Sequence, residues 1–426
     1  MPLKQTFTGL VLPTTTLLVT LLGATPLPAQ QVSCVIHISV DGLRPDAITA
    51  LGPANVRNFY RMRTEGAFTD NARSDYDYTE TLQNHTTQMT ARGVLGPTGH
   101  NWTGNSDPAA GETLHSNKGS YVAGVYDVAH DNGLRTGHYA SKSKFSLFNT
   151  SWNATYGAPD LVPPDYGRDK IDVYLNNSDT AVLENSMLAS MTAQPFQYVF
   201  LHLRDPDSTG HSSGWIVSPT TSAYCNTIRL MDSRLGQIFN LIDTDARFTG
   251  RTAIVLTADH GGSGTGHGDP TLAADYTIPF YVWGPGVMPA ADLYLLNPTS
   301  RLNPGTGRPL YSAPVQPIRN GDAANLALEL LGLPAVPGST IGVAQDLAVT
   351  VPPPSDFQLT IAGSDAVVGF TMQTNVLYDI QGREDLTSGD WSDVQTNIQG
   401  IAGSHTNVIV GQAASAHHFY RLKLHF

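Results

Sequence analysis

Short apolar runs that end next to acidic residues or histidine constrain the fold of this chain more than any other sequence feature. The first three runs are followed within a few positions by Asp41, Asp207 and the pair Asp259-His260. Apolar runs of this length are typical of strands that are buried on both faces of a parallel sheet. The runs cover residues 35–40, 198–203, 252–256 and 278–283.

Segments with helical periodicity separate these runs. The clearest covers residues 222–243, where apolar side chains recur every three or four positions at Ile228, Met231, Leu235, Ile238 and Ile242. Alternating strands and helices predict an α/β fold with a mostly parallel central sheet and helices on both faces. Ligands of such folds bind beyond the carboxyl ends of the strands, where the acidic residues and histidines gather.

Composition predicts four segments along the chain. Residues 1–30 have the pattern of a signal peptide, which predicts export to the periplasm or the extracellular space. A retained membrane anchor is the alternative, but Pro13 interrupts an apolar stretch that is already shorter than a membrane span. Residues 31–350 are expected to form the catalytic domain and the Pro-rich residues 351–356 a linker. Residues 357–426 alternate apolar and polar positions, which predicts a small all-β sandwich.

Charge and cysteine content exclude several classes of protein. The net charge is -12 and no run of Lys or Arg occurs, so we expect no binding of nucleic-acid duplexes or anionic membranes. Because the apolar stretch near the start belongs to the predicted signal peptide, we also expect no membrane span in the mature chain. The only two cysteines, Cys34 and Cys225, exclude a disulfide-rich scaffold and a thiolate zinc cluster. They leave open whether one disulfide forms. In the sandwich, Trp391 and Tyr378 are candidate exposed aromatics for contact with a glycan or the cell envelope.

Carboxylates and imidazoles occur at spacings that suit metal ions. Asp207 and His211 are four positions apart, Asp259 and His260 are adjacent, and His267 follows closely. Oxygen and nitrogen ligands without thiols suit Zn²⁺, with Mn²⁺ or another borderline ion as the alternative. The full set of candidates is Asp41, Asp207, His211, Asp259, His260 and His267.

The motifs together resemble those of the alkaline phosphatase superfamily and, within it, the type I phosphodiesterase and nucleotide pyrophosphatase family. They are the segments 40–42, 81–85, 207–211, 257–262 and 266–268, and the resemblance covers about residues 35–345. It implies an alkaline-phosphatase-like fold. It also implies that Asp207, His211 and His267 hold one zinc ion, and that Asp41, Asp259 and His260 hold the second together with the hydroxyl of Thr81.

Thr81 is the nucleophile that this resemblance implies, since a divalent ion can hold its hydroxyl as an alkoxide. The residue is expected just before a helix that begins near Asn84, where backbone amides favour an anion. His267 comes earlier after the Asp-His pair than in many members of the family. The alternatives for the last ligand, all in the predicted sandwich, are His405, His417 and His418.

Two further features bear on a small-molecule phosphoester substrate. Asn105 stands where diesterases of the family bind a phosphoryl oxygen, with Asn101 as the alternative. Lys142 and Lys144 would lie on one face of a strand, as do the basic pairs by which related monoesterases and phosphonate hydrolases bind substrate. We therefore expect a phosphodiesterase or nucleotide pyrophosphatase that forms a phosphothreonine. The alternatives are a phosphomonoesterase or phosphonate hydrolase and a non-catalytic envelope or polysaccharide binding protein.

Overall fold

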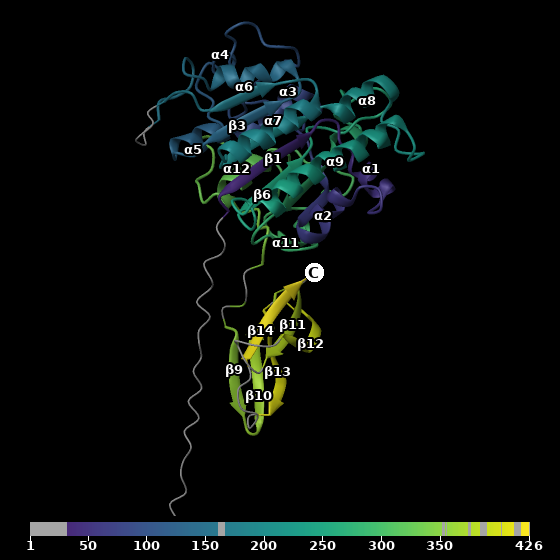
Figure 1. Cartoon of the computed structure of the whole chain (residues 1–426), viewed down its shortest axis with the longest axis vertical. Coiled ribbons are helices and arrows are strands. Elements are labelled where there is room, and N and C mark those ends of the chain that lie inside the picture. The colour runs from purple at the N-terminus through teal and green to yellow at the C-terminus, as the bar shows by residue number, and fades with distance from the viewer. Residues whose placement is uncertain are drawn as a thin grey trace, which may run out of the picture.

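The computed structural model describes residues 32–160, 167–351, 354, 356–373, 376–383, 390–401, 403–412 and 419–425. The predicted signal peptide and three residues of the predicted linker, Pro352, Pro353 and Ser355, lie outside the described residues. Figure 1 shows a larger body, in which helices surround a sheet, and a smaller body made of the last strands.

One sheet of eight strands forms the centre of the larger body. In spatial order the strands are β4 (Val173–Asn176), β3 (Thr136–Ala140), β5 (Tyr198–Leu203), β1 (Cys34–Val40), β6 (Thr252–Thr257), β7 (Thr277–Trp283), β2 (Ala67–Arg73) and β8 (Ala291–Asp292). The first five are parallel to their neighbours, whereas β7 is antiparallel to both β6 and β2. The mostly parallel sheet is confirmed. Because β7 is reversed, its carboxyl end lies at the opposite edge from those of β1, β5 and β6.

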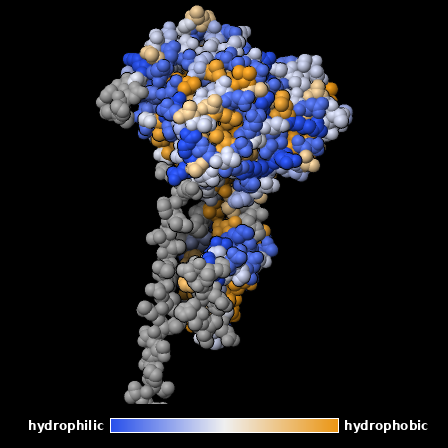
Figure 2. Space-filling model, in the orientation of Figure 1, coloured by the Kyte–Doolittle hydropathy of each residue, from blue (hydrophilic) through white to orange (hydrophobic). Residues whose placement is uncertain are grey.

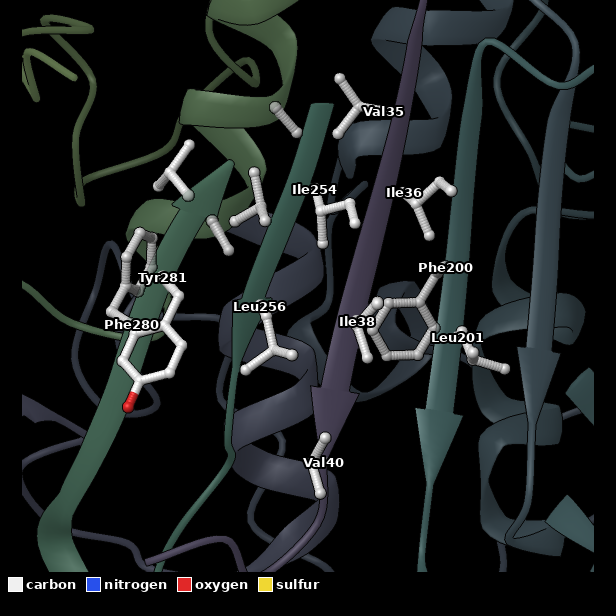
Figure 3. Packing of buried hydrophobic residues seen from close by; sticks show 14 of the residues in the cluster. Val35, Ile36, Ile38, Val40, Phe200, Leu201, Ile254, Leu256, Phe280 and Tyr281 are labelled. Carbon is white, nitrogen blue, oxygen red and sulfur yellow. The ribbon is translucent and has the colours of Figure 1, made fainter. Parts of the chain in front are cut away.

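The three central strands owe their position to their apolar side chains. Every residue of β1, β5 and β6 is buried. Figure 3 shows Ile36 and Ile38 of β1 beside Ile254 and Leu256, their partners on β6. Burying one such side chain stabilises the fold by roughly 1.5–3 kcal/mol. The strands that carry the acidic residues at their ends are therefore among the most firmly held parts of the chain.

Helices cover both faces of the sheet, as predicted (Figure 1). In one group, α9 (Ala223–Thr244) contacts α1 (Pro45–Leu51), α2 (Arg57–Glu65), α7 (Thr180–Ala193) and α8 (Asp205–Ser213). In the other, α12 (Asp322–Leu330) contacts α3 (Thr81–Thr90) and α5 (Val125–Asp131). The shorter elements are α4 (Leu114–Lys118), η1 (Ser143–Phe145), α6 (Ser146–Ser151), α10 (Ala273–Tyr276) and α11 (Leu293–Leu296).

The visible surface of the larger body mixes residue types. Figure 2 shows hydrophobic residues in separate patches among hydrophilic ones on this face. Within the described part of the chain, no helix combines the length and the apolar character that crossing a membrane requires.

The smaller body consists of two antiparallel sheets. One contains β9 (Gln358–Ala362), β10 (Asp365–Thr371) and β13 (His405–Gln412), and the other contains β11 (Leu377–Arg383), β12 (Ser392–Gln399) and β14 (Phe419–His425). Phe370 from the first sheet and Tyr378 and Ile380 from the second share one apolar cluster, so the prediction of a sandwich is confirmed. Tyr378 is fully buried, which corrects its interpretation as an exposed aromatic. Trp391 is half-buried, with the guanidinium of Arg421 4.5 Å from its ring centre.

Candidate metal centre

The carboxyl ends of β1, β5 and β6 bring three acidic residues together. Asp41 follows β1, Asp259 follows β6, and Asp207 lies in the first turn of α8 after β5. The backbone N–H of Asp207 donates to the carbonyl of Asp41 at 3.1 Å. The N–H of Gly42 donates to Oδ1 of Asp259, also at 3.1 Å. Backbone contacts thus hold the three strand ends against one another.

Gly42 allows this close approach. Its φ is +70°, in the left-handed region that favours glycine, and a Cβ at this position would lie 3.0 Å from Cα of Asp207. A side chain here would push α8 away from the end of β1. The glycine of the Asp41-Gly42 motif therefore sets the separation between Asp41 and Asp207.

Three histidines present an unprotonated Nε2 atom to this region. Nδ1 of His260 donates to the carbonyl of Gly261 at 2.8 Å. Nδ1 of His267 donates to the carbonyl of Thr79 at 2.6 Å, and Nδ1 of His211 to that of Thr265 at 3.0 Å. Because a carbonyl oxygen only accepts, each neutral imidazole carries its proton on Nδ1. Nε2 is then free to bind a metal ion, which is the usual arrangement of metal-binding histidines.

Asp207, His211 and His267 form the first of two groups, called here the outer group. Nε2 of His211 lies 3.2 Å from Nε2 of His267 and 3.3 Å from Oδ1 of Asp207. Nε2 of His267 is 3.6 Å from the same oxygen. Two ligands of a tetrahedral zinc ion with bonds of about 2.0–2.1 Å lie roughly 3.3 Å apart. A proton or a cation must lie among these three atoms, and their spacing fits a metal ion.

Asp41, Asp259 and His260 form the second, inner group. All three are fully buried. Nε2 of His260 is 3.2 Å from Oδ2 of Asp259 and 3.5 Å from Oδ1 of Asp41. The rings of His260 and His267 are stacked, with centres 3.6 Å apart, so the inner and outer groups are neighbours. His260 is within reach of both sets of ligand atoms.

Four buried atoms of these groups have no hydrogen-bond partner among the described residues: Oδ1 of Asp41, Oδ1 of Asp207, Oδ2 of Asp259 and Nε2 of His260. Leaving one such polar atom unsatisfied costs roughly 1–3 kcal/mol, and more if it is charged. All four are acceptors that point at the same small region, and a bound cation would satisfy them. The residues therefore fit two divalent ions.

The ionisation of the inner group agrees with this fit. Burial and the nearby charge of Asp41 raise the pKa of Asp259 well above its ordinary value. Burial opposes ionisation of Asp41 as well, but Lys142 and His202 outweigh it and hold the pKa of this carboxyl well below its usual range. Burial lowers the pKa of His260 to about 3, which keeps the imidazole neutral. Crowded carboxylates beside a neutral imidazole suit a divalent cation.

Thr81 is the first residue of α3, so the helix begins three positions earlier than predicted. Glu80 precedes it as the N-cap residue, which excludes an N-cap role for Thr81. The threonine hydroxyl accepts a hydrogen bond from Nζ of Lys142 at 3.2 Å.

Asn84, in the motif of residues 81–85, has a structural role. Its side-chain amide donates to the carbonyls of Tyr78 and Glu80 and so fixes the segment that leads into α3.

Two buried histidines, for which the sequence predicted no role, hold site residues in place through hydrogen bonds. Nε2 of His202 donates to Oδ2 of Asp41 at 2.9 Å. Nδ1 of His85 donates to the carbonyl of Thr81 at 2.7 Å, and the hydroxyl of Ser39 donates to Nε2 of His85. The available signal was that Ser39 and His202 interrupt otherwise apolar runs.

Asn105 lies beside the start of α3. Its Oδ1 accepts from the N–H of Leu82 at 3.1 Å and from Nζ of Lys144 at 3.0 Å. These contacts occupy the carbonyl end of the amide and leave the Nδ2 end for a ligand. Asn101, the alternative, sits in the preceding turn, where its N–H donates to Val94. It is not among the described residues that line the cavity at Thr81.

Lys142 and Lys144 do not lie on a strand, because β3 already ends at Ala140 and Lys144 belongs to the short helix η1. Both nevertheless reach the cavity at Thr81, which has a volume of about 460 Å³. Arg204, which sequence reasoning missed, adds a third basic side chain. The lining residues are Thr81, Asn105, Lys142, Ser143, Lys144, Arg204, Asp207, Ser208, His211 and His267.

The remaining sequence candidates lie elsewhere. His405 is on β13 and contacts Asp356, while His417 and His418 lie outside the described residues. Cys34 and Cys225 are separate buried thiols.

Comparison with known proteins identifies relatives of the larger body. The model of the type I phosphodiesterase / nucleotide pyrophosphatase family matches residues 35–275, more than half of the chain. GPI ethanolamine phosphate transferase 1 of Neurospora crassa is 32% identical over 199 residues, which are 39% of this chain and 19% of that protein. The enzyme of the same name from Aspergillus fumigatus is 40% identical over 204 residues, which are 39% of this chain and 18% of that protein. The chain thus spans about a fifth of the length of these relatives.

Solved structures resemble the fold. A 2-O GAG sulfatase covers 80% of this chain with 80% of its own, at a TM-score of 0.50 and 14% identity. Murine ectonucleotide pyrophosphatase / phosphodiesterase 5, solved in complex with AMP, covers 72% of this chain with 96% of its own, at a TM-score of 0.48 and 15% identity. The architecture is alkaline-phosphatase-like.

Proposed function

The chain belongs to the type I phosphodiesterase / nucleotide pyrophosphatase family, and on that premise we propose that it hydrolyses phosphoesters with Thr81 as nucleophile and two divalent metal ions. The observation that carries the proposal is the convergence of unsatisfied acceptor atoms at one end of the sheet. The ligand set is complete in both groups, which weighs against a non-catalytic binding protein. The signal-peptide pattern of residues 1–30 supports the further proposal that the enzyme acts after export.

Zinc is the ion that we propose, because the donors are imidazole nitrogens and carboxylate oxygens without thiolates. The outer group and the inner group would each hold one ion. Bound there, the ions would lower the pKa of the threonine hydroxyl and neutralise charge that develops on the phosphoryl oxygens.

Different residues of the chain would take part in different steps of the reaction. The Thr81 oxygen attacks phosphorus, so that a bond forms between them while the bond to the leaving alcohol breaks. Nδ2 of Asn105 donates to a phosphoryl oxygen, and the positive end of the α3 dipole favours the same anion. Water then attacks the phosphothreonine, which releases phosphate monoester or phosphate and restores Thr81.

The test compares a diester with a monoester. We expect the purified protein with zinc to hydrolyse bis-p-nitrophenyl phosphate with a higher kcat/KM than p-nitrophenyl phosphate. Thr81→Ala should lower both rates by on the order of 10³-fold or more. Thr90→Ala is the matched control, because Thr90 lies on the same helix and its hydroxyl only donates to the carbonyl of Thr86.

A preference for the monoester would move the assignment to a phosphomonoesterase or phosphonate hydrolase. The three basic residues that line the cavity, Lys142, Lys144 and Arg204, favour that alternative, because they suit a substrate with one more negative charge. Activity that survives Thr81→Ala would contradict the proposed nucleophile. If the protein binds metal but hydrolyses neither esters nor phosphonates, the remaining assignment is a non-catalytic binding protein.

A second candidate function is transfer of a phosphoethanolamine group to an alcohol. It is favoured by the relatives, which are named GPI ethanolamine phosphate transferases. The same phosphothreonine could react with an alcohol instead of water. With p-nitrophenyl phosphoethanolamine and added glycerol, hydrolysis yields phosphoethanolamine and transfer yields its glycerol ester. Mass spectrometry of the products separates the two.

A further inference from the structure

The ammonium group of Lys142 lies inside the candidate metal centre. Its Nζ is 2.5 Å from Oδ2 of Asp41 and 2.7 Å from Oδ2 of Asp207, and it donates to the hydroxyl of Thr81. The side chain is only 15% exposed. Lys142 therefore contacts one carboxylate of the inner group, one of the outer group and the proposed nucleophile.

The oxygens that Lys142 contacts are not the ones left for metal ions. Both contacts use Oδ2, whereas Oδ1 of Asp41 and Oδ1 of Asp207 are the buried atoms without a partner. Oδ1 of Asp41 faces His260, and Oδ1 of Asp207 faces His211 and His267. Each carboxylate thus offers one oxygen to the ammonium and the other to a metal group, so a metal ion and Lys142 do not compete for the same atom.

Charge supports the same arrangement. Asp41, Asp207 and Asp259 place three acidic groups at the ends of neighbouring strands. The ammonium of Lys142 lies against two of them, Asp41 and Asp207, and brings a positive charge to this cluster. Neighbouring Lys144 makes no such contacts and instead donates to Asn105.

We propose that Lys142 is a permanent third cation of the metal centre, which links the inner and outer groups through the aspartate oxygens that the metal ions do not use. This inference rests on the proposed two-metal site. It differs from the expectation that Lys142 serves only to bind substrate. In that case the ammonium would leave the carboxylates when metal binds.

The first test measures the accessibility of Lys142 in the wild-type protein. Acetic anhydride is added to the metal-free protein and to the zinc-loaded protein, and peptide mass mapping gives the extent of acetylation at each lysine. Lys170, which is fully buried and paired with Asp131, is the protected reference, and exposed Lys423 is the reactive one. We expect Lys142 to be as protected as Lys170 in both states. Protection that is lost on zinc loading would overturn the inference.

The second test uses matched variants. In EDTA, Lys142→Met should lower the melting temperature by about 5–10 °C, because removing one partner leaves buried carboxylates unpaired. Saturating zinc should recover most of this loss. Lys144→Met is the control and should melt close to wild type in EDTA. A shift of less than about 2 °C for Lys142→Met in EDTA would contradict the inference.

The two tests separate this inference from the proposed function. If the protein binds no zinc, the two-metal function fails, while the melting temperatures in EDTA still report on Lys142. If Lys142→Met folds only when zinc is present, the lysine is needed to hold the carboxylates together, as proposed. If Lys142→Met folds neither with nor without zinc, the acetylation of Lys142 in the wild-type protein decides whether the inference holds.

Discussion

The inner and outer groups contain the same kinds of ligand but differ in their surroundings. Asp41, Asp259 and His260 of the inner group are fully buried, whereas the side chain of His211 in the outer group is 49% exposed. The outer group borders the cavity at Thr81, and the inner group lies behind it. The comparison indicates that one ion would be enclosed by protein and that the other would stay open to solvent and substrate.

The cause of the difference is the element that carries each ligand. Asp41 and Asp259 come one and two positions after strands that are buried along their whole length. Asp207 and His211 lie on the short helix α8, and His267 lies in a loop, where the hydroxyl of Thr79 donates to its carbonyl. Ligands on buried strands keep their geometry, while those on a surface helix and a loop adapt more readily.

The comparison predicts unequal losses of metal. Asp259→Asn should weaken binding of one ion by roughly 100-fold or more, because even partners of ligands change metal affinity about 10- to 100-fold and buried Asp259 has no substitute. His211→Asn should cost only about 10-fold, since water can replace an exposed ligand. Chelator competition and elemental analysis give the affinities and the stoichiometry. Equal losses in the two variants would show that burial does not distinguish the groups.

Gly42 tests whether the two groups depend on each other. Gly42→Ala should destabilise the fold by about 2–4 kcal/mol, from left-handed strain plus the clash with Asp207. It should also weaken the outer metal site, because α8 must shift. Gly119→Ala is the control: Gly119 is left-handed, with a φ of +77°, but a Cβ there meets nothing within 4 Å. Denaturant unfolding of both variants measures the difference, and equal losses would exclude the clash as a cause.

Substitutions of residues that line the cavity but belong to neither metal group should lower activity without loss of metal. Asn105→Ala should lower kcat/KM by roughly 100-fold, as loss of one donor to the transition state does. Lys144→Met should cost about 10-fold, because it releases only the carbonyl end of Asn105, and Lys144→Arg should recover part of that activity. Both variants should retain zinc as the wild type does. Loss of zinc in either variant would mean that the cavity and the metal groups are not separable.

Much of the fold and of the ligand set followed from local sequence pattern. Buried strands end at Asp41 and Asp259 as expected, because short apolar runs need burial on both faces. Asp207 and His211 lie on one face of α8, because a spacing of four matches a helical turn. The predicted segment boundaries and the roles of the site residues stay predictions.

Other features could not be predicted from local pattern. The segment around Lys142 alternates like a strand but forms a turn and a short helix, because β3 ends where the sheet contacts end. His202 interrupts an apolar run, but only the pairing of β1 with β5 brings it to Asp41. Arg204 has no such local signal. Their roles depend on residues far away along the chain.

The sequence by itself determined which strands are buried and which residue types stand at their ends, since both depend on neighbouring positions. Only the tertiary structure decided how the aspartate oxygens are shared. It gives Oδ2 of Asp41 to Lys142 and His202 and leaves Oδ1 to the metal group. The physical reason is that a carboxylate has two acceptors in fixed directions, and packing alone determines which group each one meets.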